Sequence, residues 1–494
     1  MSRVMLVQPW NYHDEGIKEF NLEWEWRNGP YSLILLATQL STHGHDVKIV
    51  DLTRDLVVAR GNLALVQNDF TQTIISFRPD IIGFGFFSIH YFEVKKAVEL
   101  ARRICTEISL NTIFVAGGIH ASTEPIRTVK DLGFDYSFVG EGDLGILELA
   151  DGCVPTEVQG IVAADSTEIT TGRQIHDLNT LPIPDWTLCD YEFYKYPSFG
   201  KIKYKKSRSI DMIMGRGCVY KCSFCAYNAL SRVRFYSAGY LVDQIEKYYR
   251  DLGIDGIYFT DSTIGNNRRL IREFCEEMLL RGTAQRVEWY ANIRPNQISE
   301  KDLKLMWRAG CRFLFYGFES GSQRTLDLMV KGIDLEDNYR AAELHNRLGY
   351  LYHASMMFGY PGEREEDILM TFRFLESVRP PIIGINWYVP LPGSPDYDKL
   401  KAQGIINSDD PQEWRRIGEI NGCRVYADVP DSRFRELYAR ALTLSTDIQK
   451  NNRAAWGCLA PPQSAFEYNQ INDPGFLGKI ASKVKRAINV ISVR

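Results

Sequence analysis

Three cysteines lie close together in the middle of the chain, at Cys218, Cys222 and Cys225, separated by three and then two residues. Cysteine thiolates are soft ligands that hold iron–sulfur clusters. A compact loop can place three thiolates at three corners of a [4Fe–4S] cluster, which leaves the fourth iron without a protein ligand. An open metal position is where a substrate or cofactor can be activated. The spacing therefore predicts a [4Fe–4S] cluster with one open iron.

A structural zinc site is the alternative for these cysteines, and it needs a fourth ligand that usually lies near in the sequence. The next cysteine is Cys275, and the next histidine is His345. Both are far from the loop, and a strand-like run at Ile210–Met214 leads into it. We therefore favour the cluster over zinc.

The spacing Cys-x3-Cys-x2-Cys, with the aromatic Phe224 before the last cysteine, resembles the signature of radical S-adenosylmethionine (radical SAM) enzymes. The resemblance implies that the open iron chelates the methionine moiety of S-adenosylmethionine (SAM). It also implies that reduction of the cluster cleaves a carbon–sulfur bond and releases a 5′-deoxyadenosyl radical. Phe224 is assigned to the SAM site on the same resemblance, and an external electron donor such as a flavodoxin or ferredoxin is expected.

Strand and helix signals alternate from about residue 207 to residue 400, on both sides of the cysteine loop. This succession of β/α units predicts a partial parallel (β/α)6 barrel, in which chemistry gathers where strands end at their carboxyl face. Polar residues follow the predicted strands at that face. We assign five of them to the SAM site: Asp261, Ser262, Arg294, Glu319 and Ser320.

Chemistry and resemblance both contribute to these assignments. The Glu319 carboxylate can accept hydrogen bonds from a ribose hydroxyl or an ammonium group, and Arg294 can pair with a carboxylate. The segments Phe318–Gly321 and Phe358–Glu363 resemble recurring radical SAM segments, which implies that Glu319 lies near the ribose or methionine. The turn Asp261–Thr263 is implied to lie near the methionine amino group, although it lacks the family's usual glycines. Helix capping and turn formation are the alternative, and both interpretations stay open for Ser262 and Ser320.

Residues 1–150 show the same alternation of strand and helix signals. Five short apolar runs separated by helical segments predict a parallel, doubly wound sheet, so the chain belongs to the α/β class. The runs are Val4–Val7, Val47–Asp51, Ile81–Gly85, Thr112–Gly118 and Tyr136–Gly140. Such sheets bind ligands beyond the carboxyl ends of their strands, where glycines let the backbone approach a large ligand closely. No G-x-G-x-x-G follows the first run, so a dinucleotide fingerprint is absent.

The residues at these strand ends resemble the cobalamin-binding domain that precedes many radical SAM domains. The resemblance implies an edge that holds cobalamin, lined by Ser88, Gly117, Gly118, Gly140 and Glu141. The segment Asn11–Gly16 has the spacing of the cobalt-binding D-x-H-x-x-G motif, but asparagine replaces the aspartate that normally orients the histidine. We therefore assign His13 to a loop, with cobalt ligation as the alternative.

Composition limits the remaining possibilities. The net charge of -4 gives no reason to expect a nucleic-acid partner, and no apolar run reaches the length of a membrane span. The first residues are typical of a strand rather than a signal peptide, and the other seven cysteines are scattered. We therefore expect reduced thiols and a cytoplasmic location.

The predicted organisation has four parts: a cobalamin-binding domain at 1–150, a linker at 151–206, the barrel at 207–400 and a helical C-terminal region at 401–494. Val158–Ile175 is predicted as a hairpin, and the basic run Lys201–Lys206 as a solvated surface. The tail Leu477–Val493 mixes basic and apolar residues. We expect it to pack on the barrel or to be loosely ordered, with contact to an anionic membrane as the alternative.

Together these features predict a cobalamin-binding radical SAM enzyme that resembles the class B methyltransferases. The implied reaction is methylation of an unactivated carbon of a small molecule: the deoxyadenosyl radical removes hydrogen, and the substrate radical takes a methyl group from methylcobalamin. A radical cyclase or rearrangement enzyme with the same cofactors is the alternative. A methylthiotransferase would need a second cluster on N-terminal cysteines, but the first cysteine is Cys105. A silent cobalamin carrier would not need the three clustered cysteines. Natural-product, lipid and tetrapyrrole substrates stay open.

Overall fold

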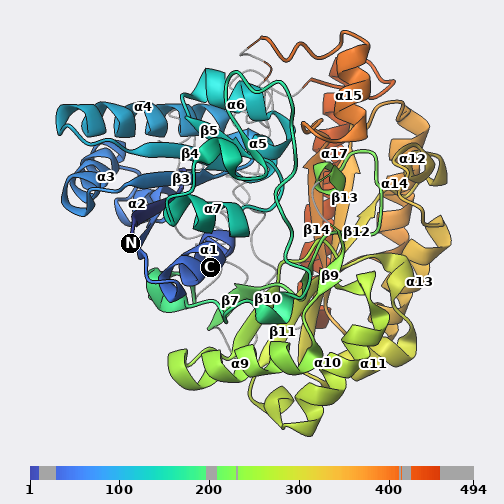
Figure 1. Cartoon of the computed structure of the whole chain (residues 1–494). Coiled ribbons are helices and arrows are strands. Elements are labelled where there is room, and N and C mark those ends of the chain that lie inside the picture. Colours follow the sequence, from blue (N-terminus) through green and yellow to red (C-terminus); the bar gives the residue numbers. More distant parts are fainter. Residues whose placement is uncertain (11–28, 196–207, 230–231, 411–412, 414–423, 457–494) are drawn as a thin grey trace, which may run out of the picture.

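Two six-stranded sheets form the centres of the fold (Figure 1). The computed structural model describes residues 1–10, 29–195, 208–229, 232–410, 413 and 424–456. His13, the basic run Lys201–Lys206 and the tail Leu477–Val493 lie outside the described residues. The domain boundaries predicted from the sequence stay predictions.

The first sheet is parallel except at one edge and has the strand order β2-β1-β3-β4-β5-β6. Its strands are β1 (Arg3–Gln8), β2 (Asp46–Asp51), β3 (Ile81–Gly85), β4 (Ile113–Gly117), β5 (Tyr136–Phe138) and β6 (Ile161–Val162). The connecting helices are α1 (Tyr31–Thr42), α2 (Leu52–Val58), α3 (Leu63–Phe77), α4 (Tyr91–Glu107), α5 (Ile119–Thr123), α6 (Pro125–Leu132) and α7 (Asp143–Ala150). All five predicted strands are present, and the doubly wound arrangement is confirmed.

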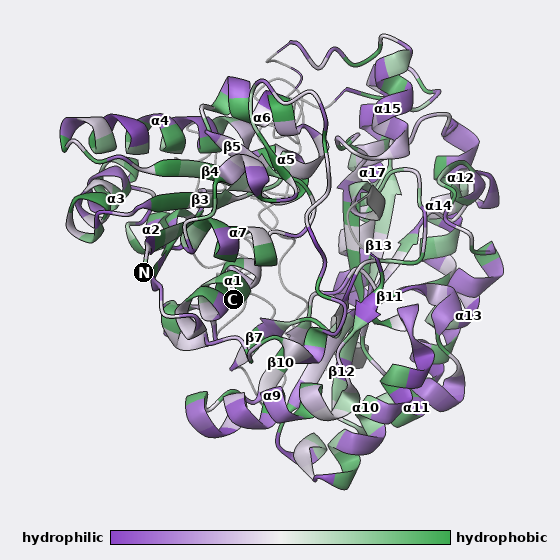
Figure 2. Cartoon of the chain, in the orientation of Figure 1, coloured by the Kyte–Doolittle hydropathy of each residue, from purple (hydrophilic) through white to green (hydrophobic). Residues whose placement is uncertain are grey.

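Side chains alternate across this first sheet and bury both of its faces. Val4 and Leu6 of β1 pack with α1 and α7, whereas Met5 and Val7 pack with α3 and α4. Because both faces are covered by helices, the central strands β1, β3 and β4 are largely apolar, whereas the edge strand β2 carries the exposed Asp46 and Lys48. Figure 2 shows β3 and β4 as hydrophobic, whereas α4 alternates between hydrophobic and hydrophilic residues.

The predicted hairpin at Val158–Ile175 is wrong. Ile161–Val162 forms β6, which pairs antiparallel with β5 and extends the first sheet. No second strand occurs in the segment 163–175, all of which is described. Local turn signals suggested a self-contained hairpin, but the edge of an existing sheet offers the same backbone hydrogen bonds.

The second sheet is a run of six parallel strands in chain order, as expected for a partial (β/α)6 barrel. Its strands are β7 (Ser209–Met212), β10 (Gly256–Phe259), β11 (Glu288–Ile293), β12 (Cys311–Glu319), β13 (Tyr352–Phe358) and β14 (Ile382–Trp387). The helices are α9 (Ala238–Leu252), α10 (Arg268–Leu280), α11 (Glu300–Arg308), α12 (Gln323–Leu328), α13 (Leu335–Leu348) and α14 (Glu365–Val378). A short antiparallel ribbon, β8 (Gly215–Arg216) with β9 (Arg234–Phe235), brackets the cysteine loop.

The chain after the barrel contacts both sheets. Helix α17 (Asp431–Trp456) packs against β14 and α14. In contrast, Tyr397 and Leu400 of α15 (Pro395–Ala402), together with Ile406, are buried in the core of the first sheet. This segment therefore ties the barrel to the first sheet. None of the helices in the described part of the chain has the length and apolar character needed to cross a membrane.

Candidate active site

The carboxyl edges of the two sheets meet at the cysteine loop. The guanidinium of Arg216, just after β7, pairs with Glu141 and Asp143, which follow β5. Helix α5, which follows β4, lies against the short 3-10 helix η7 (Ala226–Ala229), which begins directly after Cys225. Figure 1 shows the first sheet and the barrel side by side. A ligand on the carboxyl edge of the first sheet would therefore lie next to the cysteine loop.

Backbone hydrogen bonds fix the start of the cysteine loop. The Asp261 carboxylate, two residues after β10, accepts hydrogen bonds from the N–H groups of Met214 and Gly215 at 2.8 and 2.9 Å. Farther along, Asn266 donates to the carbonyl of Gly217. Burial raises the pKa of Asp261 to about 7. Asp261 thus positions the loop, and its predicted contact with SAM stays a prediction.

The far end of the loop is held by the barrel. Ser223 donates its N–H to the carbonyl of Met329 at 2.9 Å. Its hydroxyl is hydrogen-bonded at 2.7 Å to Tyr360, whose own hydroxyl donates to Asp396 at 2.6 Å. The sequence singles out the segment Phe358–Glu363 but not this role of Tyr360, and it does not mark Asp396, because the role depends on a contact between residues 137 positions apart. The loop is therefore fixed at both ends before any cofactor binds.

The donor set fits a cluster better than a single zinc ion. Cys218 and Cys225 are partly exposed, Cys222 is buried, and all three are free thiols. Each thiolate of a cluster site binds a different iron, so three thiols serve a cluster, whereas a structural zinc site usually takes a fourth ligand from close by in the sequence.

Two buried cations stand beside these thiols. The Arg294 guanidinium lies 3.2 Å from the Cys222 sulfur and stacks over the Tyr220 ring at 3.8 Å. It also donates to the carbonyl of Lys331. Burial raises the pKa of the Cys218 thiol, while Arg294 and Lys331 act in the opposite direction. Positive charge next to a thiolate favours its deprotonated, metal-binding form.

Glu319 occupies a strained position at the end of β12. Its φ of +62° lies in the left-handed region, and the register between β12 and β13 shifts at this residue. Its carboxylate pairs with Lys331 at 2.8 Å, and both residues are buried. A side chain at Gly317 would lie only 2.5 Å from the Glu319 carboxylate. Strain of this kind concentrates at functional sites, where the surrounding structure maintains it.

The structure brings some of the predicted SAM residues together. Arg294, Glu319 and Phe224 surround Lys331, whose ammonium lies 5.7 Å from the Phe224 ring centre. No signal in the sequence marked Lys331, which comes twelve residues after its partner. Ser320, by contrast, is fully buried and bonded to Thr371 and Ser322. Those bonds build the turn after β12.

Ser262 is exposed, in the turn that follows β10. Its contact with SAM stays a prediction, as does that of Ser320.

The predicted cobalamin residues gather on the edge of the first sheet. Gly118 has a φ of +93°, and a side chain there would lie 2.6 Å from the Phe86 carbonyl oxygen. The Gly140 N–H donates to the Ser122 hydroxyl at 2.9 Å. A Cβ at Gly117 would meet nothing closer than 3.9 Å. These glycines leave the edge without side chains where a large planar ligand would lie, which fits cobalamin.

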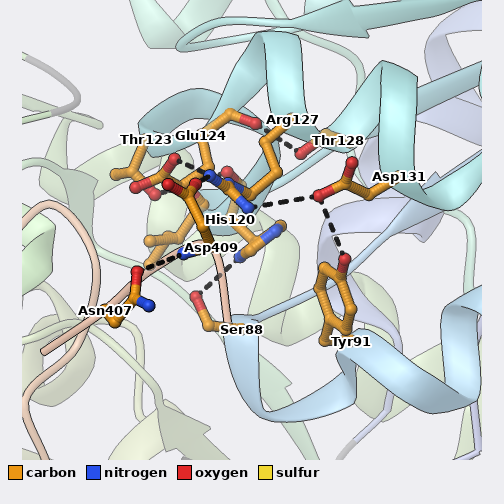
Figure 3. A network of polar contacts seen from close by, with 11 residues as sticks. Ser88, Tyr91, His120, Thr123, Glu124, Arg127, Thr128, Asp131, Asn407 and Asp409 are labelled. Atoms are coloured by element: carbon orange, nitrogen blue, oxygen red, sulfur yellow. Dashed lines mark hydrogen bonds and ion pairs between the residues drawn. The ribbon is translucent and has the colours of Figure 1, made fainter. Parts of the chain in front are cut away.

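A polar network includes residues of α5, the helix that follows Gly118 (Figure 3). Ser88 is hydrogen-bonded to the buried His120 at 2.9 Å. Burial lowers the pKa of His120 to about 3, so its imidazole is neutral. In the same network Arg127 of α6 pairs with Asp131 and with Asp409 of the segment after the barrel. Ser88 thus positions the edge through His120, and direct contact with cobalamin stays a prediction.

The side chain of Glu141, which we predicted to contact cobalamin, has other partners. Its carboxylate oxygens bind Arg216 and Arg234 of the barrel domain. The sequence analysis missed both arginines. A contact between Glu141 and cobalamin stays a prediction.

Comparisons with known proteins agree with this architecture. A model described as the B12 binding domain matches residues 28–150, and a model described as the radical SAM superfamily matches residues 212–375. The chain is 25% identical over 405 residues to the uncharacterized methyltransferase PH0819 of Pyrococcus horikoshii, covering 79% of this chain and 82% of that protein.

Two further similarities are of interest. The anaerobic magnesium-protoporphyrin IX monomethyl ester cyclase of Cereibacter sphaeroides is 26% identical over 81% of this chain, which spans 64% of the cyclase. Among solved structures, TsrM from Kitasatospora setae, a radical SAM methyltransferase with cobalamin and a [4Fe–4S] cluster bound, superposes with a TM-score of 0.64 at 20% identity. The match covers 82% of this chain and 78% of TsrM.

Both matched models fall on the two sheets whose edges meet at the cysteine loop. The cofactors of this protein are accordingly a [4Fe–4S] cluster, SAM and cobalamin. The chain belongs to the radical SAM enzymes that carry a cobalamin-binding domain.

Proposed function

We propose that this protein methylates an unactivated carbon of a small-molecule substrate. The observation that carries the proposal is the contact between the cysteine loop and the carboxyl edge of the first sheet, made by Arg216 with Glu141 and Asp143. A methyl group can reach a short-lived substrate radical only if both cofactors open into one site. The similarity to PH0819, a methyltransferase by name, supports the same reaction.

The roles of individual residues are part of this proposal. Cys218, Cys222 and Cys225 would hold the cluster. Arg294 and Lys331 would pair with the SAM carboxylate, and Glu319 would accept a hydrogen bond from its amino group or ribose. The bound cofactors would supply a hydrogen-abstracting radical and a transferable methyl group.

The glycines Gly117, Gly118 and Gly140 would form the floor beneath cobalamin. In the same proposal Phe224, on the cysteine loop, would cover part of the SAM site. We further expect an external one-electron donor such as a flavodoxin or ferredoxin, together with a cytoplasmic location. Enclosing the radical between the two edges would keep water away from it.

A radical cyclase with the same cofactors is the second candidate, and the similarity to the magnesium-protoporphyrin cyclase favours it. The two functions differ in what becomes of SAM. Methylation converts one SAM to S-adenosylhomocysteine and a second to deoxyadenosine. A cyclase that transfers no methyl group would form deoxyadenosine without S-adenosylhomocysteine. A methylthiotransferase is disfavoured, because Cys105, the first cysteine of the chain, lies within α4 and is buried in the core of the first sheet.

The test begins with anaerobically reconstituted protein. Iron, sulfide and cobalamin are quantified, and SAM is then added with a chemical reductant and hydroxocobalamin. We expect about one cobalamin and one four-iron cluster per chain. We also expect S-adenosylhomocysteine, whose formation from SAM needs no added substrate. Protein that binds the cluster without cobalamin, or that forms only deoxyadenosine, would exclude the methylation route.

Two cysteine variants provide the matched comparison. Cys222→Ala removes a thiol of the loop and should abolish both the cluster absorbance and the formation of deoxyadenosine. Cys153→Ala removes an exposed thiol just after α7 and should leave both unchanged. Full turnover by Cys222→Ala would contradict the assignment of the cluster.

A further inference from the structure

We propose that Arg216 is a positioning residue that fixes the cluster loop relative to the cobalamin-binding edge. The inference rests on the proposed function, because the relative position of the edges matters only if both cofactors act on one substrate. It concerns a residue that touches neither the three cysteines nor the edge glycines directly. Arg216 acts through the ion pairs that it makes across the boundary between the two sheets.

The geometry of these pairs is well defined. The Nη1 and Nη2 atoms of Arg216 each lie 2.8 Å from a different oxygen of Asp143, which gives a forked contact. Nη1 also lies 2.9 Å from Glu141. Arg234 binds the other oxygen of Glu141. The side chains of Arg216, Glu141, Asp143 and Arg234 are only 11, 11, 7 and 9% exposed.

On the barrel side, Arg216 is rigidly connected to the cluster. It is the last residue of β8 and stands two positions before Cys218. Its neighbour Gly215 is held by Asp261, and a side chain at Gly215 would lie 2.4 Å from the carbonyl oxygen of Arg234. The ribbon of β8 and β9 therefore moves as one unit with the first cysteine.

On the other side, hydrogen bonds continue from the ion pairs to the glycine edge. Gly140, which precedes Glu141, donates its N–H to the Ser122 hydroxyl at 2.9 Å. Ser122 in turn donates to the carbonyl of Gly118 at 2.8 Å. A displacement of Glu141 would thus be passed to the turn at Gly118. The ion pairs connect two loops that the proposed function requires to face each other.

Stability alone does not explain a buried group of four charges. Taking charges out of water costs several kcal/mol for each ion, and apolar contacts hold protein surfaces together at least as well. Burial lowers the pKa of Arg216, but Asp143 and Glu141 more than offset this and raise it. What a forked arginine–carboxylate pair adds is a fixed distance and a fixed angle.

The test compares Arg216→Gln and Arg216→Lys with a control, Arg272→Gln. Arg272 also makes a forked pair, with Asp302, but this pair joins α10 to α11 in the helical layer of the barrel, and the Arg272 side chain is 51% exposed. All proteins are reconstituted with cluster and cobalamin and are given SAM and reductant. We expect Arg216→Gln to keep forming deoxyadenosine while its ratio of S-adenosylhomocysteine to deoxyadenosine falls roughly tenfold or more. Arg216→Lys should recover part of the ratio, and Arg272→Gln should not change it.

A second readout does not depend on turnover. In the protein without cofactors, Arg216→Gln should accelerate amide hydrogen exchange in residues 140–147 and 215–225 together, by roughly tenfold. The control should leave both segments unchanged. If Arg216→Gln fails to fold, Asp143→Asn tests the same pairs from the other side.

The outcomes separate the two proposals. A wild-type protein that forms no S-adenosylhomocysteine would overturn the proposed function. If the wild type forms it and Arg216→Gln keeps the same product ratio, the positioning role is wrong. Exchange that accelerates in only one of the two segments would also overturn it, because the ion pairs would then not couple the loops.

Discussion

Substitutions at two adjacent glycines at the end of β4 can test folding and cobalamin binding independently. Gly118 has φ +93° and ψ −172°, a conformation open almost only to glycine, and its Cβ would lie 2.6 Å from the Phe86 carbonyl oxygen. Gly117 has an ordinary φ, and a Cβ there would meet only the Phe84 carbonyl oxygen, at an ordinary contact distance of 3.9 Å. We therefore expect Gly118→Ala to impair folding, and Gly117→Leu to impair cobalamin binding alone.

The magnitudes follow from this geometry. Backbone strain at Gly118 costs about 1–3 kcal/mol, and the contact with Phe86 adds to it, so Gly118→Ala should lose at least about 2 kcal/mol. For a domain of 150–250 residues this lowers the midpoint of thermal unfolding by about 4–8 °C. Gly117→Leu should stay within about 1 kcal/mol of the wild type. Its side chain would occupy the ligand's space and weaken hydroxocobalamin binding by about tenfold or more.

The assay combines thermal unfolding of the protein without cofactors with an absorbance titration of hydroxocobalamin. Gly44→Ala is the control for backbone strain alone, since its φ is +87° but nothing lies within 4 Å of its Cβ position. It should lose less stability than Gly118→Ala and keep its affinity for cobalamin. Wild-type affinity in Gly117→Leu would refute the placement of cobalamin on this edge. Wild-type stability in Gly118→Ala would refute the packing argument.

Two further predictions concern the barrel. Lys331→Met should weaken SAM binding in calorimetric titrations and destabilise the protein by about 3–5 kcal/mol, because the buried Glu319 loses its partner. Adding Glu319→Gln should recover stability but not affinity for SAM. Recovery of both would argue against a contact between Lys331 and SAM. Burial lowers the pKa of His345 to about 4, so between pH 6.5 and 4 the unfolded chain binds a proton that the folded chain does not, and stability falls on acidification. His345→Gln should flatten the dependence of the unfolding free energy on pH by up to about 1.4 kcal/mol per pH unit. Urea unfolding at pH 7, 6 and 5 measures this slope, and an unchanged slope would contradict the lowered pKa of His345.

Much of this protein could be predicted from local patterns in its sequence. The spacing of Cys218, Cys222 and Cys225 by itself predicts a cluster loop, because three ligands in one short loop need no knowledge of the rest of the fold. Alternating apolar runs predicted both parallel sheets, since buried strands and amphipathic helices each leave a periodic signal. The glycines of the first sheet were found in the same way, at the ends of those runs.

Contacts between distant segments were decided only by the tertiary structure. The family resemblance implies cofactor contacts for the carboxylates of Glu141 and Asp261, yet in the structure Glu141 binds Arg216 and Asp261 binds backbone N–H groups. Lys331 carried no signal at all, because its role arises from a strained Glu319 and from Arg294, which lies on another loop. The sequence by itself determines where each strand ends and which chemical groups follow it. Only the docking of the two edges decides which of those groups face a cofactor and which face each other, because that pairing depends on distances between segments that no local pattern records.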